Sequence, residues 1–320
     1  MSKSAKIWLI VATSLLLIGC LIFGGVMTVL KWDFSKLSTN RYETKKYEIG
    51  EKFSSISIKV DTADVKILPS DGADCSVECH EQKNIKYSVE VKDNVLTVEV
   101  IDSRRWYEHI GINFGSPKVT VYLPCGEYDK LSVRSDTGDT EISKDFSFEI
   151  IDIAASTGNV KNYASASDDV KIKTSTGDIL VENTSAKSID LSVSTGDIAL
   201  SDVNCSGDVS IRVSTGRARL TNLKCQNLIS GGNTGDIVLK SVIASGEISI
   251  KRSTGDVKFE ASDAASIFVE TDTGDVKGSL LSEKIFIVNT DTGKTDVPES
   301  TTGGRCKITT DTGDIKITIS

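Results

Sequence analysis

A Thr-Gly pair that returns at every nineteenth or twentieth residue constrains this chain more than any other feature. Its glycines occupy positions 138, 158, 177, 196, 216, 235, 255, 274, 293 and 313. Self-similarity at a short, fixed period is the signature of a solenoid, in which each repeat is one structural unit that stacks on its neighbours. The sequence therefore predicts one elongated repeat domain.

The residues around each glycine predict a sharp corner between two strands. Thr precedes the glycine in all ten repeats, and Asp, Ser or Asn precedes the Thr. Such side chains hydrogen-bond the backbone of turns, and Gly adopts the positive φ that a tight corner needs. Apolar residues alternate on both sides, as at Ile189, Leu191, Ile198 and Leu200, which is the pattern of strands. The predicted structural turn residues are Thr176, Gly177, Thr195, Gly196, Thr234, Gly235, Thr254, Gly255, Thr273 and Gly274.

Repeats of this length cannot bury an apolar face alone, so we expect them to stack about 4.8 Å apart with equivalent strands in parallel. The predicted fold is all-β, a parallel β-solenoid (β-helix) of about ten coils of 19–20 residues over 131–320. Nine residues after the glycine, a column of small residues predicts a second bend: Ala186, Cys205, Cys225, Ala244 and Ala264. Cys205 and Cys225 are there either buried thiols or a disulfide.

Residues 47–130 predict a degenerate first coil followed by a β-rich cap. Ala63 takes the glycine position of a repeat-like segment, and two strands are predicted on either side of a turn at Asp93-Asn94. A cap is expected because bare strand edges invite aggregation. Large apolar residues around Trp106 are interpreted as cap core, with a ligand groove as the alternative.

The N-terminal segment predicts attachment to a membrane. Residues 7–30 carry no charge and are long enough for a transmembrane helix, between a tail at 1–6 and a linker at 31–46. Leu17-Ile18-Gly19-Cys20 also fits a bacterial lipobox, so a lipoprotein anchored at Cys20 is the alternative. Lysines and an arginine after the helix favour a cytoplasmic domain by count, but long domains translocate regardless of flanking charge.

One residue after the corner glycine, a column of carboxylates has two interpretations. Asp178, Asp197, Asp236, Asp256 and Asp275 belong to it. They either cap the turns, or bind a cation such as Ca²⁺ through stacked oxygens. Turn capping is favoured, because Asn159, Arg217 and Lys294 interrupt the column and the nonapeptide of calcium-binding β-rolls is missing. No cofactor is predicted.

Charge and motif content argue against nucleic-acid binding and catalysis. The formal net charge is −8, whereas phosphate binding needs a basic face. The sequence contains two histidines and no nucleophile–base pair, phosphate loop or zinc motif, so we predict no catalytic residue and no enzyme. A glycan-active β-helix lyase or hydrolase is the alternative, with Arg217, Arg219 and Arg252 as the irregular residues that would serve it.

Several motifs occur together in this chain: a D-T-A-D-V first coil, the block W-Y…I-G-I-N-F…P-K-V-T-V-Y-L-P and repeated S/D-T-G-D-I/V turns behind an apolar segment. In this combination, residues 47–320 resemble the bacterial putative-adhesin β-strand-repeat family of unknown function, which includes LiaG-like membrane proteins of Gram-positive bacteria. The resemblance implies a single-pass cell-envelope protein with an extracytoplasmic solenoid. It would serve as a binding or scaffold module for an envelope glycan or protein, with a link to envelope stress.

Self-assembly is a further alternative. Ile315, Ile317 and Ile319 end the chain with an apolar strand and no evident cap. Two molecules could therefore stack end to end through this last coil.

Overall fold

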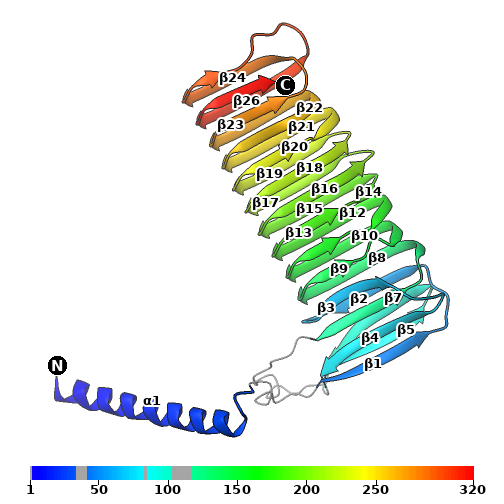
Figure 1. The fold of residues 1–320 in the computed structure, drawn as a ribbon, viewed down its shortest axis with the longest axis vertical. Helices are drawn as coiled ribbons and strands as arrows, with labels where there is room; N and C mark the ends of the chain where they lie inside the picture. The colour runs from blue at the N-terminus through cyan, green and yellow to red at the C-terminus, as the bar shows by residue number, and fades with distance from the viewer. Residues whose placement is uncertain (1, 34–41, 83–84, 103–116) are drawn as a thin grey trace.

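The computed structural model describes residues 2–33, 42–82, 85–102 and 117–320, and it consists of one helix and a long β-solenoid (Figure 1). Helix α1 (Lys3–Val29) begins at Ser2, whose hydroxyl accepts a hydrogen bond from the Ala5 N–H at 3.3 Å. Within its 27 residues an 18-residue window has a mean hydropathy of 2.5, and most of its apolar side chains are exposed, whereas Met27 is buried. The helix could cross a membrane, and a signal sequence would have the same properties.

The solenoid confirms the predicted strand, corner, strand pattern. The strands that precede the corners are β2 (Ser55–Val60), β8 (Gly126–Thr137), β10 (Phe146–Thr157), β12 (Ser165–Thr176), β15 (Ser188–Thr195), β17 (Val209–Thr215), β19 (Leu228–Thr234), β21 (Ile243–Thr254), β22 (Val257–Thr273), β24 (Lys284–Thr292) and β26 (Gly304–Thr312). Those that follow the corners are β3 (Asp64–Pro69), β9 (Thr140–Ile142), β11 (Val160–Asn162), β13 (Ile179–Glu182), β16 (Ile198–Cys205), β18 (Ala218–Cys225), β20 (Ile237–Lys240), β23 (Val276–Leu280), β25 (Thr295–Asp296) and β27 (Ile315–Ile319), and β22 also continues from the Gly255 corner. The short β14 (Ser185–Ala186) continues one coil.

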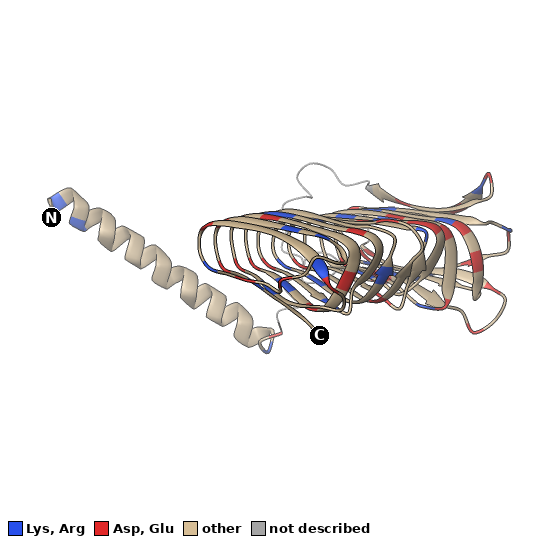
Figure 2. Cartoon of the chain, turned by 90° about the horizontal axis from the view of Figure 1, so that it is seen from above, with Lys and Arg blue, Asp and Glu red and all other residues tan. Residues whose placement is uncertain are grey.

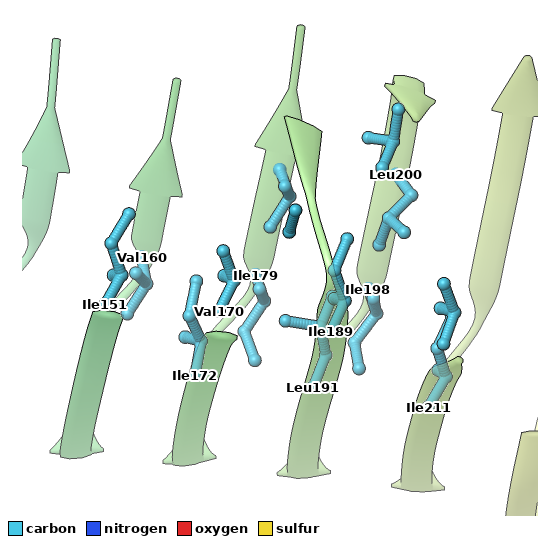
Figure 3. Close-up of a cluster of buried hydrophobic side chains, with 14 of the residues drawn as sticks. Ile151, Val160, Val170, Ile172, Ile179, Ile189, Leu191, Ile198, Leu200 and Ile211 are labelled. Carbon is cyan, nitrogen blue, oxygen red and sulfur yellow. The ribbon is translucent and has the colours of Figure 1, made fainter. Parts of the chain in front are cut away.

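Equivalent residues of neighbouring coils pair in parallel, as the repeat predicts. Ile172 of β12 is paired with Leu191 of β15, and Leu191 is paired with Ile211 of β17. Residues with the same place in the repeat therefore form continuous columns along the axis. Figure 3 shows such apolar columns inside the solenoid, with Ile172, Leu191, Ile198 and Leu200 all buried.

The corner glycines are required by contact between coils. Nine of them have φ between 125° and 157°, a region that disfavours every L side chain. A Cβ placed on Gly196 would lie 2.2 Å from the carbonyl oxygen of Gly177, and the same clash recurs at each corner. Ala63 is tolerated in the first coil because its lower neighbour is Pro117, whose carbonyl accepts the Asp64 N–H, and not another corner glycine.

The two C-terminal coils stack in the reverse of their chain order, which corrects the prediction of an exposed last strand. Strand β26 pairs with both β22 and β24, and β27 pairs with both β23 and β25. Ile315 and Ile317 are consequently buried. The outermost coil is instead β24–β25, seen at the top of Figure 1, where Ile285 and Ile287 are exposed. Any end-to-end contact would have to use β24.

The other end carries the expected β-rich cap. Strands β6 (Val95–Asp102) and β7 (Lys118–Leu123) pair in parallel with β2 and β3 and so continue the stack below the first coil. Strand β5 (Ile85–Lys92) pairs antiparallel with β6, and the predicted turn at Asp93-Asn94 is confirmed by their φ of 50° and 66°. Strand β4 (Cys75–Gln82) joins β7 to the edge strand β1 (Tyr42–Ile49). Trp106 and its apolar neighbours lie outside the described residues.

Strand β1 begins inside the segment that the sequence predicts as a linker. Its first five residues, 42–46, pair antiparallel with β4 although they are mostly polar. The Lys45 ammonium contacts the Glu81 carboxylate, whose other oxygen accepts the Tyr87 N–H at 2.9 Å. Glu81 is fully buried, so this ion pair holds β1 against the cap.

We predict that the variant Gly196→Ala lowers the free energy of unfolding by more than about 1 kcal/mol, because Ala is strained at φ 142° and its Cβ meets the Gly177 carbonyl. Gly231→Ala is the matched control, since nothing lies within 4 Å of a Cβ there. Denaturation monitored by circular dichroism measures both. Equal losses in the two variants would show that coil contact does not require the corner glycine.

We also predict that disulfide trapping will reveal the reversed stacking order of the last two coils. Glu270 is paired with Thr309 across β22 and β26, whereas Asn289 is paired with that same Thr309 from the far side. Cysteines at 270 and 309 should bridge rapidly on mild oxidation, because adjacent strands lie within disulfide range. Cysteines at 270 and 289 should not, since two coils separate them by about 9.6 Å. The bridges are identified by peptide mass spectrometry. A 270–289 bridge would show that the last two coils stack in the order of the chain.

Candidate binding face

The carboxylate column beside the corners forms a ladder of hydrogen bonds to the backbone. The Asp178 carboxylate accepts the Asp197 N–H at 2.8 Å, and the Asp197 carboxylate accepts the Arg217 N–H at 2.8 Å. Asp236, Asp256 and Asp275 accept the N–H of the next coil in the same way, at 2.9, 2.8 and 2.7 Å. Each carboxylate thus satisfies a donor that the corner leaves unpaired.

This geometry explains the interruptions in the column. Asn159 keeps a side-chain oxygen, which accepts the Asp178 N–H at 2.9 Å. The Arg217 backbone N–H donates to Asp197, but its side chain has no oxygen that could accept the Asp236 N–H. Its guanidinium instead donates to the Asp197 carboxylate at 3.0 Å. Within the described ranges, no group of three or more His, Cys, Asp or Glu side chains could hold a metal ion. The hydrogen bonds from each carboxylate to the backbone of the next coil support turn capping, which we propose as the column's role.

The three irregular arginines do not share a site. Arg217 lies at a corner, Arg219 is exposed on the sheet after the corner, and Arg252 is 1% exposed inside the solenoid. The Arg252 guanidinium reaches the Ser230 hydroxyl at 3.1 Å and fills the space where Gly232 would carry a side chain. Burial lowers its pKa. The cleft of convergent charges expected of the glycan-active alternative is not formed by these residues.

Cys205 and Cys225 are both buried and unbridged. The Cys205 thiol donates a hydrogen bond to the Lys187 carbonyl at 3.3 Å, and burial raises the pKa of Cys225 to about 12. Both thiols are therefore protonated and poorly reactive at neutral pH.

A row of cations on the sheet before the corners is the surface feature that sequence reasoning missed. Residues in successive register across this sheet are Arg134, Ala154, Lys173, Ser192, Arg212, Gly231 and Lys251. We call these seven positions the basic row. From Arg134 to Lys251 a cation occupies every second coil, and a small residue occupies each coil between; the alternation ends at Lys59, which is paired with Arg134 from the adjacent coil, and at Glu270, which is paired with Lys251. A comparison of the fourth residue before each corner glycine would have found this alternation.

Three of the four cations of the basic row, Lys173, Arg212 and Lys251, are exposed to solvent. The side chains of Arg212 and Lys251 are 68% and 72% exposed, and their contacts to Asp190 and Glu270 are 4.0 and 2.8 Å. Exposed pairs of this kind contribute only about 0.2–1 kcal/mol. The Lys173 ammonium makes no hydrogen bond or ion pair with a described residue, although its backbone pairs in the sheet. Arg134 alone is held firmly, by the Asp152 carbonyl at 2.9 Å and the Asp152 carboxylate.

The column next to the basic row is neutral along its middle. Two residues before the corner glycine, the terminal coils carry Asp136, Asp272, Asp291 and Asp311, while the central coils carry Ser156, Ser175, Ser194, Ser214, Asn233 and Ser253. This one column therefore lacks acids along its middle, whereas the carboxylates of Asp152, Asp190 and Glu270 lie beside Arg134, Arg212 and Lys251. Figure 2 marks the positions of the charged residues along the coils. A groove of about 590 Å³ lies over the start of the row, lined among others by Arg134, Ala154 and Lys173.

The fold and its surfaces define a class of protein: a parallel β-solenoid of corner repeats, with an N-terminal apolar helix that could enter a membrane. The Toastrack DUF4097 family model matches residues 53–211 and 203–320, and the chain belongs to this family.

Several solved structures are similar to this chain at low identity. One is described as a putative adhesin from Parabacteroides merdae, with 14% identity, a TM-score of 0.49 and coverage of 75% of this chain and 97% of that chain. A putative lipid binding protein from Parabacteroides distasonis has 16% identity, a TM-score of 0.48 and coverage of 74% and 94%. A putative adhesin from Bacteroides fragilis has 14% identity, a TM-score of 0.46 and coverage of 87% of this chain and 97% of that chain. No curated protein matches.

We predict that Asp178→Ala lowers the free energy of unfolding by about 1 kcal/mol, because the Asp197 N–H loses its acceptor. Asp178→Asn should be nearly neutral, since Asn159 performs the same role one coil below. Thermal denaturation with 5 mM Ca²⁺ or with a chelator completes the experiment, and we expect the two curves to coincide. A melting temperature raised by Ca²⁺ in the native protein, and no longer raised in Asp178→Asn, would favour the cation column.

Proposed function

We propose that this protein is a non-enzymatic, adhesin-like binding module held at the cell envelope by α1. The observation that carries the proposal is the parallel pairing of strands from β8 to β21, with one register shift between Phe148 and Ile150, which builds long exposed faces of regularly spaced side chains. Such a surface suits an extended partner better than a small molecule. Solenoids commonly bind along their extended faces.

The position of the helix supports a tethered rod. Helix α1 ends at Val29 and the edge strand β1 of the cap begins at Tyr42, so the cap is the end of the solenoid next to the helix in the chain. The faces of the central coils then project away from the membrane. An extracytoplasmic solenoid, as the family resemblance implies, would present them to an envelope glycan or protein, and occupancy of such a partner could report envelope stress.

The absence of a catalytic constellation among the described residues fits binding. The acids beside the corners accept hydrogen bonds from backbone N–H groups, and the irregular arginines lie at a corner, on the outer face of a sheet and inside the solenoid. Chemistry on a glycan needs an acid and a base brought together at one bond. The corner repeat instead distributes its carboxylates evenly along the whole rod.

We predict that Cys125 reacts with a membrane-impermeant maleimide on intact cells that produce the full chain. Cys125 is exposed, whereas the other described cysteines of the body are buried. Cys125→Ser should abolish the labelling, and lysed cells should label equally in either orientation. The same cells should adhere to isolated envelope material through the solenoid. Labelling that required lysis would place the body in the cytoplasm, and adhesion unchanged by removal of residues 47–320 would contradict the binding module.

A further inference from the structure

The basic row repeats its charge at a fixed interval along the axis. Lys173 and Arg212 are separated by the coil of Ser192, and Arg212 and Lys251 by the coil of Gly231. Two coils span about 9.6 Å at the spacing of paired strands. This distance is slightly longer than the Debye length of about 8 Å at physiological ionic strength, so solvent ions screen the cations from one another. A ligand that engages all three must bring separate charges at the same interval.

The positions between the cations leave room above the sheet. A Cβ on Gly231 would meet nothing within 4 Å, so packing does not require glycine there. Two residues before it, on the same outward face of β19, Ile229 is 52% exposed. Its register partners are Ser210 and Ser249, which makes Ile229 an isolated apolar contact between Arg212 and Lys251. Space, an apolar contact and flanking hydroxyls are features that suit the C–H face and hydroxyls of a sugar ring.

On these grounds, and resting on the binding function proposed above, we propose that the basic row binds a linear acidic polysaccharide with one carboxylate per disaccharide. The chain would run along the solenoid axis. Its carboxylates would meet Lys173, Arg212 and Lys251, and the uncharged sugars would lie over Ser192 and Gly231. A polysaccharide of this type repeats its charge once per pair of rings, at about the interval of two coils.

Denser polyanions fit the row less well. A nucleic acid strand carries one phosphate per about 3.4 Å, several for each cation of the row. Its additional charges would approach Asp190 and Glu270 beside the row and the acids of the terminal coils. The sheet after the corners also carries cations, but Lys161, Arg219, Lys258 and Lys277 lie three, two and then one coil apart. Only the basic row offers a constant interval among the described residues.

The experiment measures binding of hyaluronan oligosaccharides, which carry one carboxylate per disaccharide, to the full-length protein in detergent by calorimetry at low salt. We expect the variant Lys173→Gln/Arg212→Gln/Lys251→Gln to weaken binding by about tenfold or more, from three lost exposed contacts. Gly231→Glu should weaken it as well, because it places a carboxylate in the gap. The matched control Lys161→Gln/Arg219→Gln/Lys258→Gln removes the same charge from the other sheet and should bind like the native protein.

Three results would overturn the inference. Equal weakening by the control triple would mean attraction by net charge alone. Single-stranded DNA bound as tightly, with the same dependence on the row, would mean a general polyanion surface. No binding of hyaluronan by the native protein, while cells still adhere to envelope material, would remove the acidic polysaccharide and leave the proposed function standing. Failure of both hyaluronan binding and cell adhesion would contradict the acidic polysaccharide and the proposed binding function together.

Discussion

The approach of one corner glycine to the carbonyl of the next determines this structure. A Cβ at Gly196 or Gly216 would lie within about 2.2 Å of the oxygen below, so the coils reach strand-pairing distance only where the corner has no side chain. With that distance set, the backbone N–H of one coil meets the carboxylate of the coil beneath, and the apolar columns come into contact. The corner, the ladder and the core are therefore one cooperative arrangement, whose stability accumulates coil by coil.

The same constraint explains why so much of the fold could be predicted from the sequence. Because every coil requires a glycine at the corner, glycine recurs in the sequence at the length of one coil. The alternation of apolar residues around it identifies the strands. The buried columns at Leu191 and Leu200 and the hairpin at Asp93-Asn94 followed from local patterns. The second corner was located less well: Asn183, Asp202, Asn222, Ser241 and Ala261 adopt positive φ six residues after the glycine. Their varied side chains tolerate that conformation for different reasons, so no single residue type marked it.

What could not be predicted depends on contacts between distant segments. The exchange of the last two coils leaves the repeat pattern unchanged, because β24 and β26 are each compatible with either position. It places Lys294, which cannot extend the carboxylate ladder, in the outermost coil, where its N–H still bonds to Asp314 at 3.0 Å. Arg252 is a second case: a charge in a core column appeared irregular, yet Ser230 and Gly232 in the coil below make the space for it. In both cases the residue is accommodated by side chains or backbone groups of the adjacent coil.

The basic row likewise becomes visible only when residues of neighbouring coils are compared. The core columns and corners are constrained by packing, whereas outward positions are constrained only by solvent and by any partner. Alternation of Lys173, Ser192, Arg212, Gly231 and Lys251 on such positions is not needed for folding, and Gly231 there even lowers strand propensity. A surface pattern that costs stability and follows the period of the fold is better explained by a ligand with a period of its own than by packing. The solenoid that fixes strand spacing at about 4.8 Å thereby also fixes the spacing at which such a ligand must carry its charge.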